Sequence, residues 1–145
     1  MEYKSYHFPD GLFYHKDHSW VRFEPDGTVR IGMSEFYSRM AGDTTYADLP
    51  EVGDEIEQDQ TMGKLQSSKW VGKLIAPISG EIIEINESLE DDFMLINRDS
   101  YASGWIARVK PHNWDGESSK LMSSPSVLQA FIDQEIIRID AGGAS

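Results

Sequence analysis

Cysteine is absent from the 145 residues of the chain. Its absence excludes disulfides, thiolate metal sites and a cysteine nucleophile, so any redox group must be attached from outside. No run of about 18 apolar residues is present, which argues against a membrane-spanning helix. The N-terminal residues resemble neither a secretory signal nor a transit peptide in composition, and we therefore expect a cytoplasmic protein.

Positive charge is scarce, because 13 Lys and Arg residues face 25 Asp and Glu residues and leave a net charge of −12. Such a field repels nucleic acid and anionic membranes and favours partners with a basic face. The 39% hydrophobic and 26% charged residues are typical of a globular chain of one domain. We expect a monomer that binds neither nucleic acid nor a membrane.

Signatures of metal binding and of common catalytic sites are also missing. His15 and His18 are three positions apart, but no third ligand follows at a useful spacing. The acidic run 87–92 lacks the ligand alternation and central glycine of a calcium loop. Ser67 and Ser68 have no matched base nearby, and no Gly-rich phosphate loop occurs. We therefore expect neither a metal site nor a hydrolase.

Most of the chain is predicted to form short strands separated by turns. The predicted strands are Trp20–Phe23, Thr28–Met33, Thr44–Leu49, Glu55–Glu57, Thr61–Gln66, Val71–Ala76, Glu81–Ile85 and Gly104–Val109, in which Trp105 is expected to be buried. Strands this short and this frequent favour a compact sandwich or barrel.

Three helices are predicted from spacing and capping residues. Glu35–Ala41 follows a candidate N-cap, Ser34. It ends at Gly42, because glycine can adopt the left-handed backbone conformation that often ends a helix. Ser88–Leu95 could form a second helix. The third predicted helix is C-terminal, because apolar residues recur every three or four positions from Val127 to Ile139. Ser126 is a candidate N-cap for it. The segment 110–124 is predicted as a loop.

Lys69 stands at the predicted tip of a hairpin, in the polar turn Gln66-Ser67-Ser68-Lys69. A lysine there projects into water and contributes little to stability, so it is free to serve as an attachment point. Taken alone, it would be read as an ordinary surface lysine. Lys64 and Lys73 lie inside the flanking strands, and we discount them as sites.

The surrounding motifs resemble the lipoyl and biotinyl carrier domains, with Gly53-Asp54 before the hairpin and Pro77 eight positions after Lys69. Ser68 and Trp70 stand where biotinyl carriers have methionine, which disfavours biotin. From about His15 to Ile137 the chain is similar to the H protein of the glycine cleavage system. The matching segments, in order, are His18-Ser19-Trp20-Val21, Leu49-Pro50-Glu51-Val52-Gly53-Asp54-Glu55 and Gly104-Trp105.

This resemblance implies a mainly β (α+β) barrel-sandwich hybrid of two small antiparallel sheets with a C-terminal helix. We expect an N-terminal extension over 1–14, the lipoyl-type domain over 15–110, a loop and helix packed on it over 111–140, and a frayed tail over 141–145. The resemblance also implies lipoic acid on Lys69 and no catalytic activity of the chain itself. Its partners would be a lipoate-attaching enzyme, glycine decarboxylase, aminomethyltransferase and dihydrolipoyl dehydrogenase.

Two positions beside Lys69 depart from the family pattern. Gln66 replaces an acidic residue, and Trp70 replaces a small one. These changes resemble the H-like lipoate-binding proteins of sulfur oxidisers, which work beside a heterodisulfide-reductase-like complex, and we expect a sulfur carrier of that kind. An aminomethyl carrier and an unlipoylated binding module remain as alternatives. Trp70 could cover the lipoyl ring, form a docking site, or fold back onto the hairpin.

Overall fold

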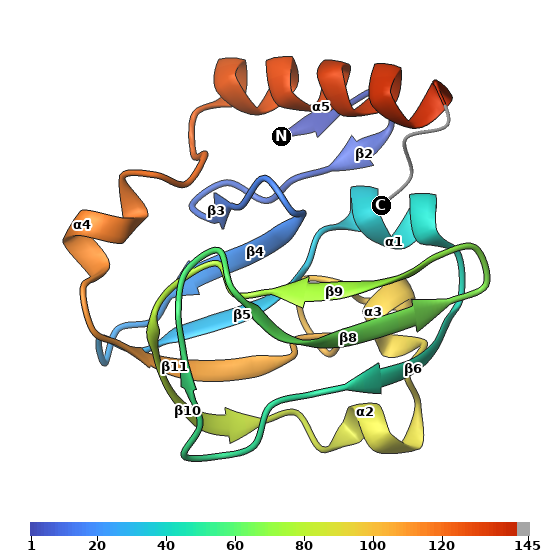
Figure 1. Ribbon diagram of the computed structural model, residues 1–145. Helices are drawn as coiled ribbons and strands as arrows, with labels where there is room; N and C mark the ends of the chain where they lie inside the picture. The colour runs from blue at the N-terminus through green and yellow to red at the C-terminus, as the bar shows by residue number, and fades with distance from the viewer. Residues whose placement is uncertain (142–145) are drawn as a thin grey trace.

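The computed structural model describes residues 1–141, and short antiparallel strands make up most of it (Figure 1). One sheet has the order β3 (Phe13–Tyr14), β4 (Ser19–Phe23), β5 (Val29–Met33), β11 (Ala107–Pro111), β10 (Gly80–Ile85) and β7 (Glu55–Ile56). A second has the order β6 (Thr44–Asp48), β8 (Thr61–Ser67) and β9 (Val71–Ile75), and β1 (Glu2–Tyr3) pairs with β2 (Tyr6–His7). The predicted mainly β fold with antiparallel sheets is confirmed.

The main core lies between the six-stranded and the three-stranded sheets. It includes Val21, Ile31 and Val109 from the first sheet and Leu65 and Leu74 from the second. Burial alternates along β8, where Leu65 and Ser67 face the core while Lys64 and Gln66 face solvent. Because successive side chains of a strand point to opposite faces, burying Leu65 forces its polar neighbours outward.

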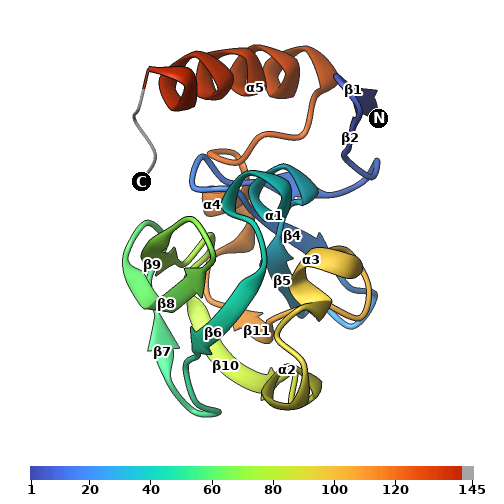
Figure 2. The same ribbon diagram turned by 90° about the vertical axis from the view of Figure 1, so that its right-hand side faces the viewer.

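Helix α1 (Glu35–Ala41) has the predicted bounds. The Ser34 hydroxyl accepts a hydrogen bond from the Tyr37 backbone N–H at 3.2 Å, as an N-cap should. Gly42 ends the helix with φ 79° and ψ −165°, a conformation that is essentially restricted to glycine. Figure 2 shows α1 between the sheets and the C-terminal helix.

The second half of the chain differs from the prediction in three places. The expected helix Ser88–Leu95 is two short helices, α2 (Ser88–Asp91) and α3 (Leu95–Arg98), because the Asp92 carboxylate accepts a hydrogen bond from the Met94 N–H and turns the chain between them. The strand expected from Gly104 begins only at Ala107, since the Gly104 N–H bonds back to the Asp99 carbonyl. Trp105 is half-buried rather than buried.

The predicted loop 110–124 contains a further short helix, α4 (Trp114–Ser118). The Asn113 side chain caps it by accepting a hydrogen bond from the Gly116 N–H at 3.3 Å. The C-terminal helix, α5 (Pro125–Asp140), begins earlier than predicted. Its N-cap is Ser124 and not Ser126, because Pro125 occupies the first helical position, where its missing N–H costs nothing.

A second core joins α5 to the N-terminal segment and α1. Its buried members are Tyr6, Phe8, Leu12, Tyr14, Trp20, Phe36, Leu128 and Ile132. The Tyr3 hydroxyl also donates to the Asp133 carboxylate at 2.7 Å. Figures 1 and 2 show α5 with β1 and β2 at one end of the molecule and α2 at the other. The first 14 residues thus pack against α5.

No helix within residues 1–141 is long and apolar enough to cross a membrane. A frayed tail was expected over 141–145, and positions 142–145 lie outside the described residues.

Candidate functional site

Lys69 lies at the tip of the β8–β9 hairpin, as predicted, and its side chain is exposed. Gln66 and Val71 are the last paired residues before the turn. The Ser67 N–H donates to the Trp70 carbonyl at 2.8 Å, while the Ser67 hydroxyl bonds to both the N–H and the carbonyl of Trp70. The turn is therefore closed by its own short-range hydrogen bonds.

The segment after α1 holds the turn from a second side. The Ser68 N–H donates to the Asp43 carbonyl at 2.9 Å, and the Lys69 N–H donates to the Ala41 carbonyl at 3.2 Å. In return, the Ser68 hydroxyl accepts a hydrogen bond from the Asp43 N–H at 3.1 Å. The backbone of the tip is thus anchored on α1 while the Lys69 side chain stays outside.

Asn97 of α3 fixes this supporting segment. Its side-chain oxygen accepts a hydrogen bond from the Thr44 N–H at 2.9 Å, and its amide nitrogen donates to the carbonyls of Gly42 at 2.7 Å and Ser38 at 3.0 Å. One side chain satisfies three backbone groups around the end of α1. Sequence reasoning missed this role, because the only signal was a polar residue after Leu95-Ile96.

The residues predicted around the attachment point face different directions. Gln66 and Ser68 are exposed, Ser67 is buried, and Trp70 is half-buried. The Trp70 ring lies 5.9 Å from that of Tyr37 of α1, measured between centroids. Trp70 therefore folds back toward α1, and it leaves the Lys69 side chain uncovered.

A cleft of about 440 Å³ opens beside the turn. Tyr37 and Trp70 line it from α1 and the hairpin, and Phe131 and Glu135 line it from α5. Burial raises the pKa of Tyr37 to about 12, so its phenol remains protonated at physiological pH. The cleft combines aromatic walls with a charged rim that includes Lys73.

His18 ties the cleft to α5. Its ring packs against those of Phe36 and Phe131, at centroid distances of 5.2 and 5.3 Å, and its Nε2 lies 2.6 Å from a Glu135 carboxylate oxygen. Arg138 binds the same carboxylate through two nitrogens. Burial by itself would raise the pKa of Glu135, but these hydrogen bonds outweigh it and lower that pKa to about 2.

His15 and His18, which sequence reasoning considered as metal ligands, bond to different carboxylates. His15 bonds to Asp59 at 2.6 Å and thereby lowers the pKa of that carboxylate, while His18 bonds to Glu135. His112 bonds to Glu55. Within residues 1–141, no group of three or more His, Cys, Asp or Glu side chains could hold a metal ion.

Comparisons with known proteins agree on one family. Residues 12–134 match the family model described as "Glycine cleavage H-protein". A "Probable glycine cleavage system H protein" of Thermococcus gammatolerans is 42% identical over 86% of this chain and 92% of its own length. A "Glycine cleavage system H protein" of Psychrobacter sp. is 42% identical over 78% of this chain and 90% of its own length.

The fold has a solved counterpart as well. A crystal structure of a glycine cleavage system H protein from Mycobacterium marinum covers 88% of this chain with a TM-score of 0.76 and 32% identity, and the match spans 98% of that protein. These relatives are named for glycine cleavage. They give no support to the expectation of a sulfur carrier.

Proposed function

The chain belongs to the glycine cleavage H-protein family, and we propose that it is a carrier that holds lipoate in amide linkage on Lys69. The observation that supports this assignment best is the contrast at the β8–β9 turn. The backbone of Lys69 is hydrogen-bonded to α1, while its side chain is exposed. Within residues 1–141, no carboxylate lies in ion-pair contact with its amine. This is the arrangement that an attachment point for a mobile arm requires.

The residues around Lys69 fit such a group. During attachment, the Lys69 amine attacks the carboxyl carbon of an acyl adenylate, the amide bond forms, AMP leaves, and one proton passes to solvent. A bound lipoyl group would supply a dithiolane, which is reduced when it accepts a transferred group and is re-formed when the resulting dithiol is oxidised. Ser67 and Ser68 keep the anchor in place, and the aromatic walls of the neighbouring cleft offer apolar contact to a hydrocarbon arm.

The names of the relatives favour an aminomethyl group as the cargo. In this proposal the chain has no catalytic activity of its own. It passes the aminomethyl group from glycine decarboxylase to an aminomethyltransferase, and dihydrolipoyl dehydrogenase reoxidises the arm. An enzyme that attaches lipoate completes the set of partners. The cytoplasmic location expected from composition stays a prediction.

Gln66 and Trp70 are the residues that favour the second candidate, transfer of sulfur with a heterodisulfide-reductase-like complex. Because Trp70 folds back against Tyr37, its bulk lies beside the cleft and not over the Lys69 amine. Trp70 therefore gives no steric reason for a dedicated attaching enzyme. Reconstitution separates the two pathways: the lipoylated chain should support release of CO₂ from glycine by glycine decarboxylase, and an inert chain would favour sulfur transfer.

The attachment itself is tested by intact mass of the protein purified from its native cells. We expect an increase by one lipoyl group, which a Lys69→Arg variant should lose. Lys64→Arg and Lys73→Arg are matched controls from the same hairpin and should keep the increase. An unmodified chain, in cells where another lipoyl protein is modified, would favour the unlipoylated module instead.

A further inference from the structure

The outer face of the three-stranded sheet flanks Lys69. We propose that this face is the docking surface for the enzyme that attaches lipoate, and that the enzyme contacts it through carboxylate side chains. We call this surface the hairpin face and define it by two cross-strand rows of exposed residues. The rows are Tyr46, Gln66 and Val71, and then Asp48, Lys64 and Lys73. The inference rests on the proposed function, since it names the partner of that same lysine.

The row nearer the turn carries exposed apolar surface. Val71 and Tyr46 are 69% and 52% exposed, and they lie in the same cross-strand row. Tyr46 is braced from one side by Phe93, whose ring centroid lies 5.8 Å away in an edge-on arrangement. Apolar and aromatic side chains of this kind are typical anchors of protein interfaces. Nothing in residues 1–141 covers Val71, which lies two positions from Lys69.

The second row places two positive charges side by side. Lys64 and Lys73 are direct cross-strand partners on β8 and β9, and such like-charged pairs destabilise a sheet. Asp48 lies across from Lys64 on β6, but no ion pair within 4.0 Å joins any of the three residues. The row carries one negative and two positive charges. Asp48 offsets only part of the repulsion between the two lysines, and an acidic partner would offset the rest.

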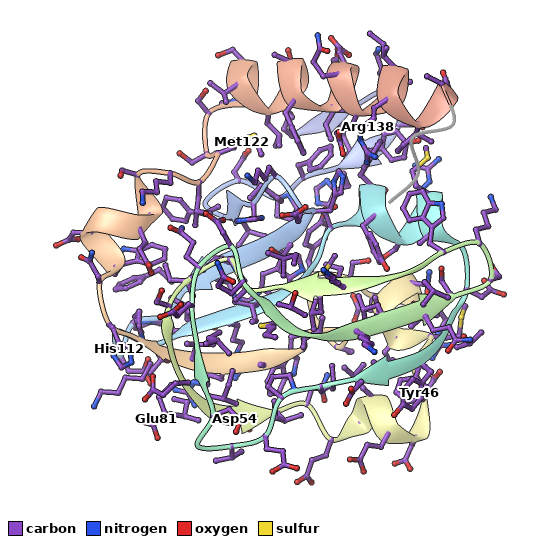
Figure 3. The ribbon with its side chains drawn as sticks, in the orientation of Figure 1. Tyr46, Asp54, Glu81, His112, Met122 and Arg138 are labelled. Carbon is purple, nitrogen blue, oxygen red and sulfur yellow. The ribbon has the colours of Figure 1, made fainter. Side chains whose placement is uncertain are left out.

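The remainder of the chain makes this face distinctive. The net charge is −12, and six of the twelve residues from Glu81 to Asp92 are acidic with no Lys or Arg among them. Figure 3 shows Asp54 and Glu81 away from Tyr46, whereas Figure 1 shows the acidic helix α2 next to β6, the strand that carries Tyr46. An enzyme surface rich in carboxylates is therefore repelled by α2 and by the chain as a whole, and it is attracted only where Lys64, Lys73 and Lys69 project from the hairpin. This contrast orients Lys69 toward the partner's active site.

Attachment also changes the charge of this face. Before modification, three lysines project from the hairpin, and acylation of Lys69 removes one of the charges. The attraction to an acidic partner is therefore weaker for the product than for the substrate, which favours release of the modified carrier.

The experiment measures the initial rate of lipoyl attachment by a purified lipoate ligase with lipoate and ATP, followed by intact mass. We expect Lys64→Gln/Lys73→Gln to slow the reaction about tenfold or more at low salt, with the difference shrinking at high salt. Lys64→Arg/Lys73→Arg keeps the charges and should retain the rate. The matched control is Lys110→Gln/Lys120→Gln, which removes the same charge away from the hairpin and should leave the rate unchanged.

The outcomes distinguish a failure of the docking surface from a failure of the carrier function. If the unchanged chain is modified and the Lys64→Gln/Lys73→Gln variant reacts as fast, the docking surface is overturned while the carrier function stands. An equal loss in the Lys110→Gln/Lys120→Gln control would assign the effect to net charge and would also overturn it. A parent chain that takes no lipoyl group would overturn the proposed function and this inference with it. Circular dichroism of each variant confirms that the fold is retained.

Discussion

Gly42 links α1 to the anchor of Lys69, and replacing it with alanine should destabilise both. Its φ of 79° and ψ of −165° lie in a region that costs other residues roughly 1–3 kcal/mol. A β-carbon at this position would also lie 2.3 Å from the Ser68 hydroxyl oxygen. Ser68 would have to move and give up its hydrogen bond from the Asp43 N–H, a further loss of about 1 kcal/mol. We expect Gly42→Ala to lower the free energy of unfolding by roughly 2–4 kcal/mol.

Urea unfolding provides the assay, and two further variants separate the contributions. Gly27→Ala is the matched control, because Gly27 has φ 86° but open space where the β-carbon would go. It should show the backbone cost alone. In a Ser68→Ala background, Gly42→Ala should cost about 1 kcal/mol less than in the parent. An unchanged cost there, or a cost of Gly42→Ala below about 0.5 kcal/mol, would refute the contact between α1 and the turn.

Two other predictions follow from the charges near the cleft. The pKa of Glu135 is about 2 in the folded protein, against 4.5 in the unfolded chain. The contacts of its carboxylate with His18 and Arg138 therefore stabilise the folded state above pH 4.5, and this stabilisation is lost as the pH falls toward 2. Because Glu135 is only partly buried and solvent screens its partners, Glu135→Gln should cost roughly 1–2 kcal/mol at pH 7 and almost nothing near pH 2 in urea unfolding, and a cost independent of pH would contradict this. Lys73→Thr should raise the free energy of unfolding by roughly 0.2–1 kcal/mol at low salt by removing repulsion from Lys64, and a loss of stability would refute that repulsion.

The elements that were predicted well depend on neighbours in the chain. Ser34 caps α1 through an N–H three residues away, and Pro25-Asp26-Gly27 turns β4 into β5, so both could be read from a short stretch of sequence. The missed helix α4 and the earlier start of α5 are also local. Their caps, Asn113 and Ser124, were present in the sequence, but weak apolar periodicity and a competing serine hid them.

The features that were missed depend on contacts over long separations. Asn97 reaches backbone groups of Ser38, Gly42 and Thr44, more than 50 residues earlier. The bond between His18 and Glu135 joins residues that are 117 positions apart. No spacing rule connects such residues, because their distance is decided by how α5 packs on the N-terminal segment. For the same reason, the contact of Trp70 with Tyr37 of α1 was not predicted, since the sequence suggested at most a fold-back onto the hairpin itself.

The sequence by itself determined the mainly β architecture, the hairpin with Lys69 at its tip, and the family resemblance that the comparisons support. Alternating burial, caps and turn residues act over a few positions, and each can be recognised locally. Only the tertiary structure decided which side chains form the cleft, which carbonyls hold the turn, and where positive charge gathers in an acidic chain. Those depend on the packing of two sheets and a distant helix, which brings together residues that no local pattern relates.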